Sequence, residues 1–128
     1  MSDTAPAPAP TEAKVAGIFS IASGLIHGVA AGLHAEHPTA ARAFAVLALV
    51  QVVAGLASLF ADGRRVRGLV AAVNAASVVG WVVAKTVGIG FIDGLKKAES
   101  VQATDLLCAV LAALAVLFAI SPRLPTSY

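Results

Sequence analysis

Four apolar segments, each long enough to cross a membrane, constrain this chain more than any other feature of its sequence. They cover residues 14–34, 39–61, 66–90 and 103–121. A helix that rises 1.5 Å per residue needs about 20 apolar residues to cross about 30 Å of hydrocarbon. The segments lack the alternation of polar and apolar residues that barrel strands show, so they predict helices. We therefore expect an all-α integral membrane protein, a single four-helix bundle in contact with the lipid bilayer.

The content of charged residues supports a membrane location. Only 12% of the 128 residues are charged and 59% are hydrophobic, whereas about a quarter of the residues in a soluble domain are charged. The charges lie mainly in the connections between apolar segments, where basic residues set membrane topology. The pI near 9.0 therefore does not indicate a nucleic-acid partner, and we expect none.

The two ends of the chain lie outside the predicted bundle. Residues 1–13, in which alanine and proline alternate from residue 5 to residue 10, predict a disordered tail. Residues 122–128 form a second tail after the last apolar segment. Asp3 and Glu12 precede Lys14, so the first segment lacks the basic region of a cleaved signal peptide. We expect it to be retained as a span.

Basic residues in the connections predict the orientation. The side of the termini carries five of them: Lys14, Arg64, Arg65, Arg67 and Arg123. The opposite side carries three: Arg42, Lys96 and Lys97. Because cytoplasmic connections are enriched in lysine and arginine, we expect a multi-pass protein of the cell membrane with both termini in the cytoplasm.

Each segment carries small and polar residues on one helical face. Polar groups within a membrane normally face the bundle interior, a partner or a water-filled cavity. Small residues on these faces are explained by helix packing alone, but the ionisable residues are not. We expect a buried polar cluster formed by Gln51, Asn74, Trp81, Lys85, Glu99 and Asp105. The ionisable residues expected in the outer half of the bundle, together with Trp81, are His27, His34, Lys85, Asp105 and Cys108.

Lys85 has three interpretations. Its amine reaches the outer membrane interface, or it forms an ion pair with Asp105 or Glu99, or it binds a ligand or takes part in catalysis. Asp105, near the start of the fourth segment, is also suited to capping that helix. Cys108 is expected to be a small buried side chain.

The three histidines suggest a metal site. His34 and His37 are three residues apart, and His27 lies seven residues before His34. Neutral imidazole is a common ligand of divalent transition metals. Our hypothesis is a divalent metal ion bound by His27, His34, His37 and Glu36; the alternative is that the histidines are interfacial residues. Haem is not expected, because all three histidines belong to the first span or its end.

Several polar positions resemble a known group of proteins. They are His27, the run His34-Ala35-Glu36-His37, Gln51, the run Trp81-Val82-Val83-Ala84-Lys85-Thr86-Val87-Gly88, and the stretch from Glu99-Ser100-Val101 to Asp105. In order and approximate spacing they are similar to those of small actinobacterial four-span membrane proteins of unknown function. The resemblance covers most of residues 20–110 and implies the fold and a polar outer cluster, but no activity. That group usually has arginine at the position of Lys85, a tryptophan in the first loop and a proline in the loop after the Thr-Val-Gly run, all absent here.

Three function classes follow from these features. The first is a protein that binds or transports a small ligand or metal ion through its polar cluster, alone or as a homodimer. The second is an accessory subunit of a larger membrane complex. A membrane enzyme ranks third, because the chain contains no recognised catalytic motif.

The orientation can be tested by cysteine labelling from outside the cell. We expect a cysteine placed at Asp93 to be labelled and one placed at Arg65 to be protected. The reverse pattern would overturn the orientation, and labelling of both positions would overturn the number of spans.

Overall fold

The computed structural model describes residues 11–61, 63–92 and 102–121, and these ranges contain four helices and no strand. The helices are α1 (Thr11–Leu33), α2 (Pro38–Phe60), α3 (Arg64–Thr86) and α4 (Ala103–Ile120). Each is long and apolar enough to cross a membrane. The predicted all-α membrane bundle is therefore confirmed.

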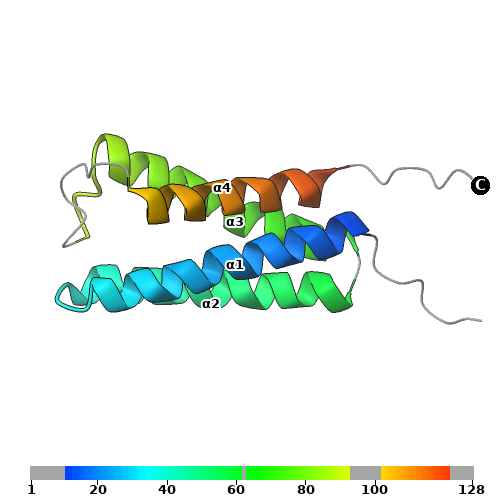
Figure 1. Ribbon diagram of the computed structural model, residues 1–128, viewed down its shortest axis with the longest axis horizontal. Helices are drawn as coiled ribbons and strands as arrows, with labels where there is room; N and C mark the ends of the chain where they lie inside the picture. The colour runs from blue at the N-terminus through cyan, green and yellow to red at the C-terminus, as the bar shows by residue number, and fades with distance from the viewer. Residues whose placement is uncertain (1–10, 62, 93–101, 122–128) are drawn as a thin grey trace, which may run out of the picture.

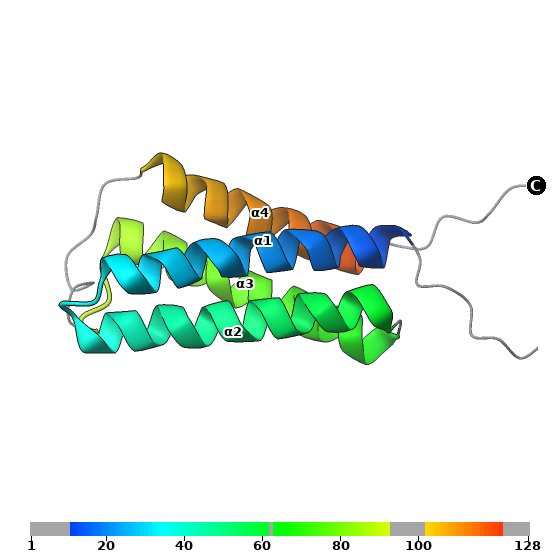
Figure 2. The same cartoon turned by 60° about the horizontal axis from the view of Figure 1, so that its bottom comes forward.

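The four helices run alternately up and down (Figure 1). α1 makes its most extensive contacts with α2, and α2 and α3 make the least extensive contact between helices that follow one another in the chain. We call the end with residues 34–37 and 87–92 the distal end, and the end where α1 begins and α4 finishes the terminal end. Toward the distal end α4 diverges from α1 (Figure 2).

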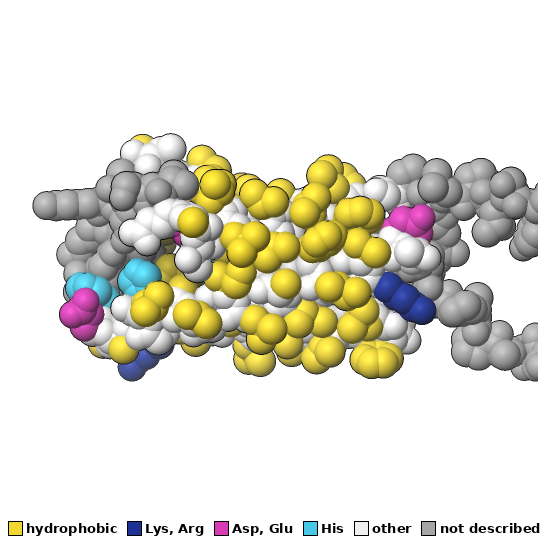
Figure 3. All heavy atoms as spheres, in the orientation of Figure 1, with side chains coloured by type: hydrophobic (Ala, Val, Ile, Leu, Met, Phe, Trp, Pro, Cys, Tyr) yellow, Lys and Arg dark blue, Asp and Glu magenta, His cyan; other side chains and the backbone are white. Residues whose placement is uncertain are grey.

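The bundle buries polar side chains among small apolar ones, and its large apolar side chains lie mostly on the outside. The largest fully buried side chains are Gln51, Val70, Asn74, Ser20, Ser23 and Ser58, and only one of these is apolar. Leucine, valine and phenylalanine side chains are widely exposed, and they cover the middle of the face shown in Figure 3, with charged side chains near its ends. Lipid tails are as apolar as these side chains, so exposure to lipid costs little. This is the arrangement expected of a bundle that is surrounded by hydrocarbon.

Two glycines allow α1 and α2 to approach closely. A Cβ atom added to Gly17 would lie 2.6 Å from the carbonyl oxygen of Gly55, and one added to Gly55 would lie 2.6 Å from the carbonyl oxygen of Gly17. Small residues let membrane helices make such backbone contacts. Ser20 Oγ also donates to the Gln51 carbonyl at 2.7 Å. The close approach therefore brings side chains of one helix within hydrogen-bonding distance of the backbone of the other.

Two helix ends differ from the predicted segments by three residues or more. α1 begins at Thr11 rather than at residue 14, and Ser58 Oγ donates to the Ala13 carbonyl at 2.6 Å, which ties this first turn to α2. α3 ends at Thr86 rather than at residue 90, because Gly88 has a φ of 77° and leaves the right-handed helical region. Residues 1–10 and 122–128 of the predicted tails lie outside the described residues.

The glycine contact predicts a selective effect of adding one methyl group. Gly55→Ala should lower the free energy of unfolding by about 1–3 kcal/mol, the usual cost of overpacking. In the matched control Gly28→Ala, the new Cβ would meet nothing closer than Ala48 Cβ at 4.0 Å, so stability should be unchanged or slightly raised. Thermal unfolding in detergent, followed by circular dichroism, measures both. Equal stability of the two variants would show that the close contact is unimportant.

Candidate functional site

A buried hydrogen-bond network joins the helices at the centre of the bundle. Asn74 Nδ2 donates to the Val70 carbonyl at 2.8 Å and to Ser20 Oγ at 3.0 Å. Because a carbonyl can only accept, these contacts fix which end of the Asn74 amide is nitrogen. Its oxygen Oδ1 then accepts from Gln51 Nε2 at 2.9 Å. The orientation of Gln51 is therefore set by a backbone carbonyl of α3.

The same chain of hydrogen bonds sets the state of His27. With Gln51 Nε2 donating, Gln51 Oε1 must accept, and it lies 2.6 Å from His27 Nδ1. His27 Nδ1 therefore carries the proton, and Nε2 of the neutral ring is an acceptor. Ser23 Oγ accepts from Gln51 Nε2 at 3.1 Å and lies 3.1 Å from the Cys108 carbonyl. The network thus reaches all four helices.

A cavity of about 640 Å³ opens beside this network at the distal end. Residues of all four helices line it, together with Ile89 and Ile92 after α3. Most of its wall is apolar. The polar side chains that line it include His27, His34, Ser77, Trp81, Lys85 and Asp105.

Asp105 holds the polar side of the cavity together. Its Oδ2 lies 2.7 Å from Lys85 Nζ, and its Oδ1 accepts from Trp81 Nε1 at 3.1 Å. Both oxygens also lie 3.2 Å from the backbone nitrogen of Gln102, the residue that caps α4. The predicted ion pair with Lys85 and the predicted cap on α4 are therefore both confirmed, and one carboxylate provides both.

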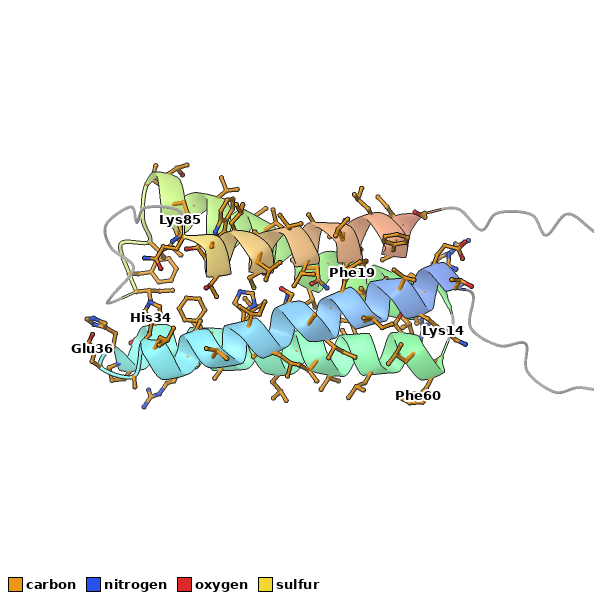
Figure 4. All side chains as sticks on the ribbon, viewed as in Figure 1. Lys14, Phe19, His34, Glu36, Phe60 and Lys85 are labelled. Atoms are coloured by element: carbon orange, nitrogen blue, oxygen red, sulfur yellow. The ribbon has the colours of Figure 1, made fainter. Side chains whose placement is uncertain are left out.

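His34 and Phe44 form the opposite side of the cavity. His34 Nδ1 donates to the Ala30 carbonyl at 2.8 Å, so the tautomer of the uncharged ring that this bond selects has Nε2 as its acceptor. The Phe44 ring centroid lies 4.9 Å from that of His34 and 6.0 Å from that of His27. Figure 4 shows His34 and Lys85 on facing helix pairs at the distal end, with Glu36 beyond them.

The structure does not bring the predicted metal ligands together. The prediction assumed that the first helix continues to His37, but α1 ends at Leu33 and residues 34–37 form a turn. His37 Nε2 lies 4.0 Å from Glu36 Oε1, whose side chain is 83% exposed. In the described ranges no group of three or more histidine, cysteine, aspartate or glutamate residues could hold a metal ion. Among the proposed ligands only His27 and His34 line the cavity.

The predicted polar cluster divides into two parts. Gln51 and Asn74 are fully buried at the centre of the bundle, whereas Trp81, Lys85 and Asp105 line the cavity. Glu99 lies outside the described residues.

The residues of the site that were not predicted include Ser23, Phe44 and Ser77. Ser23 follows Ser20 by three residues and precedes His27 by four, so its helical spacing could have revealed it. Phe44 has no comparable signal, because its position depends on how α2 packs against α1.

The site is suited to binding. It offers a wall of apolar carbon, the acceptor nitrogen of His34 and a lysine–aspartate pair that cancels its own charge. No protein-family model, curated protein or solved structure matches the chain. The geometry of the cavity is therefore what supports a function.

The ion pair predicts a non-additive effect of two substitutions. Removing one partner of a fully buried pair costs about 3–5 kcal/mol. The Asp105 side chain is 28% exposed, which reduces the expected cost of Lys85→Met to roughly 1–3 kcal/mol. Adding Asp105→Asn removes the uncompensated charge and keeps an oxygen for Trp81, so the double variant should be more stable than Lys85→Met alone.

Thermal unfolding in detergent compares the two variants, with Lys14→Met, at an exposed lysine of the terminal end, as the control. A double variant that is no more stable than Lys85→Met would show that Asp105 is not the partner that matters.

Proposed function

We propose that this multi-pass membrane protein binds a small amphipathic organic molecule in the cavity at its distal end. The observation that carries the proposal is the cavity itself, about 640 Å³ in volume and lined by residues of all four helices. Small-molecule sites in proteins are typically clefts of about 300–1,000 Å³ with mostly apolar walls and a few convergent polar groups. The distal cavity has these properties.

The charges of the cavity favour an uncharged ligand. Lys85 and Asp105 lie 2.7 Å apart and neutralise each other, so an ion entering the cavity would lose its hydration without gaining an opposite charge. His34 Nε2 can accept a hydrogen bond from a hydroxyl or amine of the ligand. The rings of Phe44 and Trp81 provide apolar contact area. A neutral molecule with an apolar body and a hydrogen-bond donor fits this arrangement best.

The proposal includes an orientation and a family. Cytoplasmic termini, predicted from the basic residues, would turn the cavity toward the outer face of the cell membrane. The His27, Gln51, Trp81 and Lys85 positions that resemble the actinobacterial four-span group all belong to the cavity or to the network beside it. If this chain is a member of that group, the other members are expected to have the same binding function.

Ligand binding can be measured through Trp81, which is the only tryptophan of the chain and lines the cavity. Tribromoethanol is a small amphiphile with one hydroxyl group, and its bromine atoms quench tryptophan fluorescence. We expect saturable quenching of Trp81 in purified protein. Ala30→Phe places a ring in the cavity wall and should weaken binding at least about tenfold, which corresponds to 1.4 kcal/mol.

The control substitution is Val29→Phe, at a neighbouring position of α1 that is 60% exposed and does not line the cavity. It should leave the affinity unchanged. Quenching that never saturates, or that is the same in both variants, would contradict a binding site in the cavity. Isolation of the protein only in a fixed complex with other subunits, with no saturable quenching, would favour the accessory-subunit alternative.

A further inference from the structure

A second hollow lies on the outside of the bundle, between α2 and α3, and adjoins the distal cavity. Its volume is about 480 Å³. Ala43, Leu47 and Ala76 line both the hollow and the cavity. The two spaces therefore share these three residues as part of a common wall. We call this outer hollow the α2–α3 groove.

The α2–α3 groove faces the hydrocarbon of the membrane. Val46, Val50 and Val73 line it together with the shared residues, and Val46 is 61% exposed. Arg42 is the charged residue in its lining and marks the level of the membrane interface, where arginine is stable. Val46 and Val50 follow Arg42 on the same helix by one and two turns, about 6 and 12 Å deeper along the axis. The groove thus runs from the interface into the apolar layer.

The two helices that border the groove are also the least tightly packed of the pairs that follow one another in the chain. Both alanines at the shared wall are exposed. A lateral opening at this shared wall would connect the polar cavity with the lipid phase, whereas a site for a water-soluble ligand would need no such opening.

We infer that the ligand of the distal cavity is a single-chain membrane lipid with an uncharged, hydroxylated head group. The inference rests on the proposed binding function and names the class of ligand. The head group lies in the cavity, where His34 Nε2 accepts from a hydroxyl on the side opposite the neutral Lys85–Asp105 pair. The chain passes between Ala43 and Ala76 and continues along the α2–α3 groove. The α2–α3 groove is one apolar track beside the cavity, which suits a lipid with one chain.

The test uses a brominated single-chain lipid in a membrane. Protein is placed in nanodiscs of unbrominated phosphatidylcholine, and the dibromo derivative of monooleoylglycerol is added in small mole fractions. We expect Trp81 quenching that saturates at low mole fraction. Ala76→Phe narrows the opening and should weaken this quenching at least about tenfold, the effect of overpacking at a wall position.

The matched control is Ala75→Phe, at an exposed alanine of the same helix that lines neither space. It should bind the lipid as the unmodified chain does. If Ala76→Phe fails to fold, Ala43→Phe tests the opposite wall of the opening, with Ala45→Phe as its control. Because Ala43 and Ala76 also line the cavity, circular dichroism and thermal unfolding in detergent, rather than tribromoethanol binding, report whether the narrowed variants are folded.

Three outcomes would overturn the inference. Saturable lipid quenching that Ala30→Phe weakens but Ala76→Phe does not would retain the cavity and reject the lateral route. Equal saturable quenching by dibrominated phosphatidylcholine would reject the single-chain class. Saturable quenching by tribromoethanol but only linear, unsaturated quenching by the lipid would leave the proposed function standing with a ligand that is not a lipid. If tribromoethanol does not bind to the unmodified chain, the proposed function itself is rejected.

Discussion

In a bundle surrounded by lipid, apolar side chains gain little by turning inward, so the helices depend on close backbone contact and hydrogen bonds to stay together. The bond from Asn74 Nδ2 to the Val70 carbonyl is the starting point of that hydrogen bonding. It fixes the Asn74 amide, which orients Gln51, which in turn determines the proton position on His27. Each of these side chains is expensive to leave unsatisfied in a membrane. This network therefore sets the position of the His27 proton at the wall of the distal cavity.

The cavity exists because the distal end is held together by polar contacts rather than by packed carbon. At the terminal end, Gly17 and Gly55 bring two backbones into contact. At the distal end, α4 diverges from α1, and Asp105 secures it to α3 through Lys85 and Trp81. A single carboxylate thus stabilises the start of α4 while leaving space beside it.

Much of the fold could be predicted, because segment length and hydrophobicity are local properties of the sequence. The Lys85–Asp105 pair could be predicted only as one of two alternatives, since the choice between Asp105 and Glu99 depends on the rotation of α4 against α3. The histidines illustrate the opposite case. A regular spacing suggested one metal site, but the end of α1 at Leu33 interrupts the helix on which that spacing relied. Phe44 was unpredictable because nothing in the pattern of α2 indicates that it faces two imidazoles.

The division of the polar network between helix pairs has a consequence for how the chain assembles in the membrane. Within the hairpin of α1 and α2, the Gln51 side chain hydrogen-bonds with His27 and Ser23, and Ser20 donates to the Gln51 carbonyl. Most polar side chains of this hairpin therefore have hydrogen-bond partners within it as soon as it leaves the ribosome and enters the bilayer. Asn74 of the second hairpin relies on Ser20 and Gln51 of the first. The first hairpin is thus in place before Asn74 arrives, and Asn74 then fixes the orientation of the Gln51 amide.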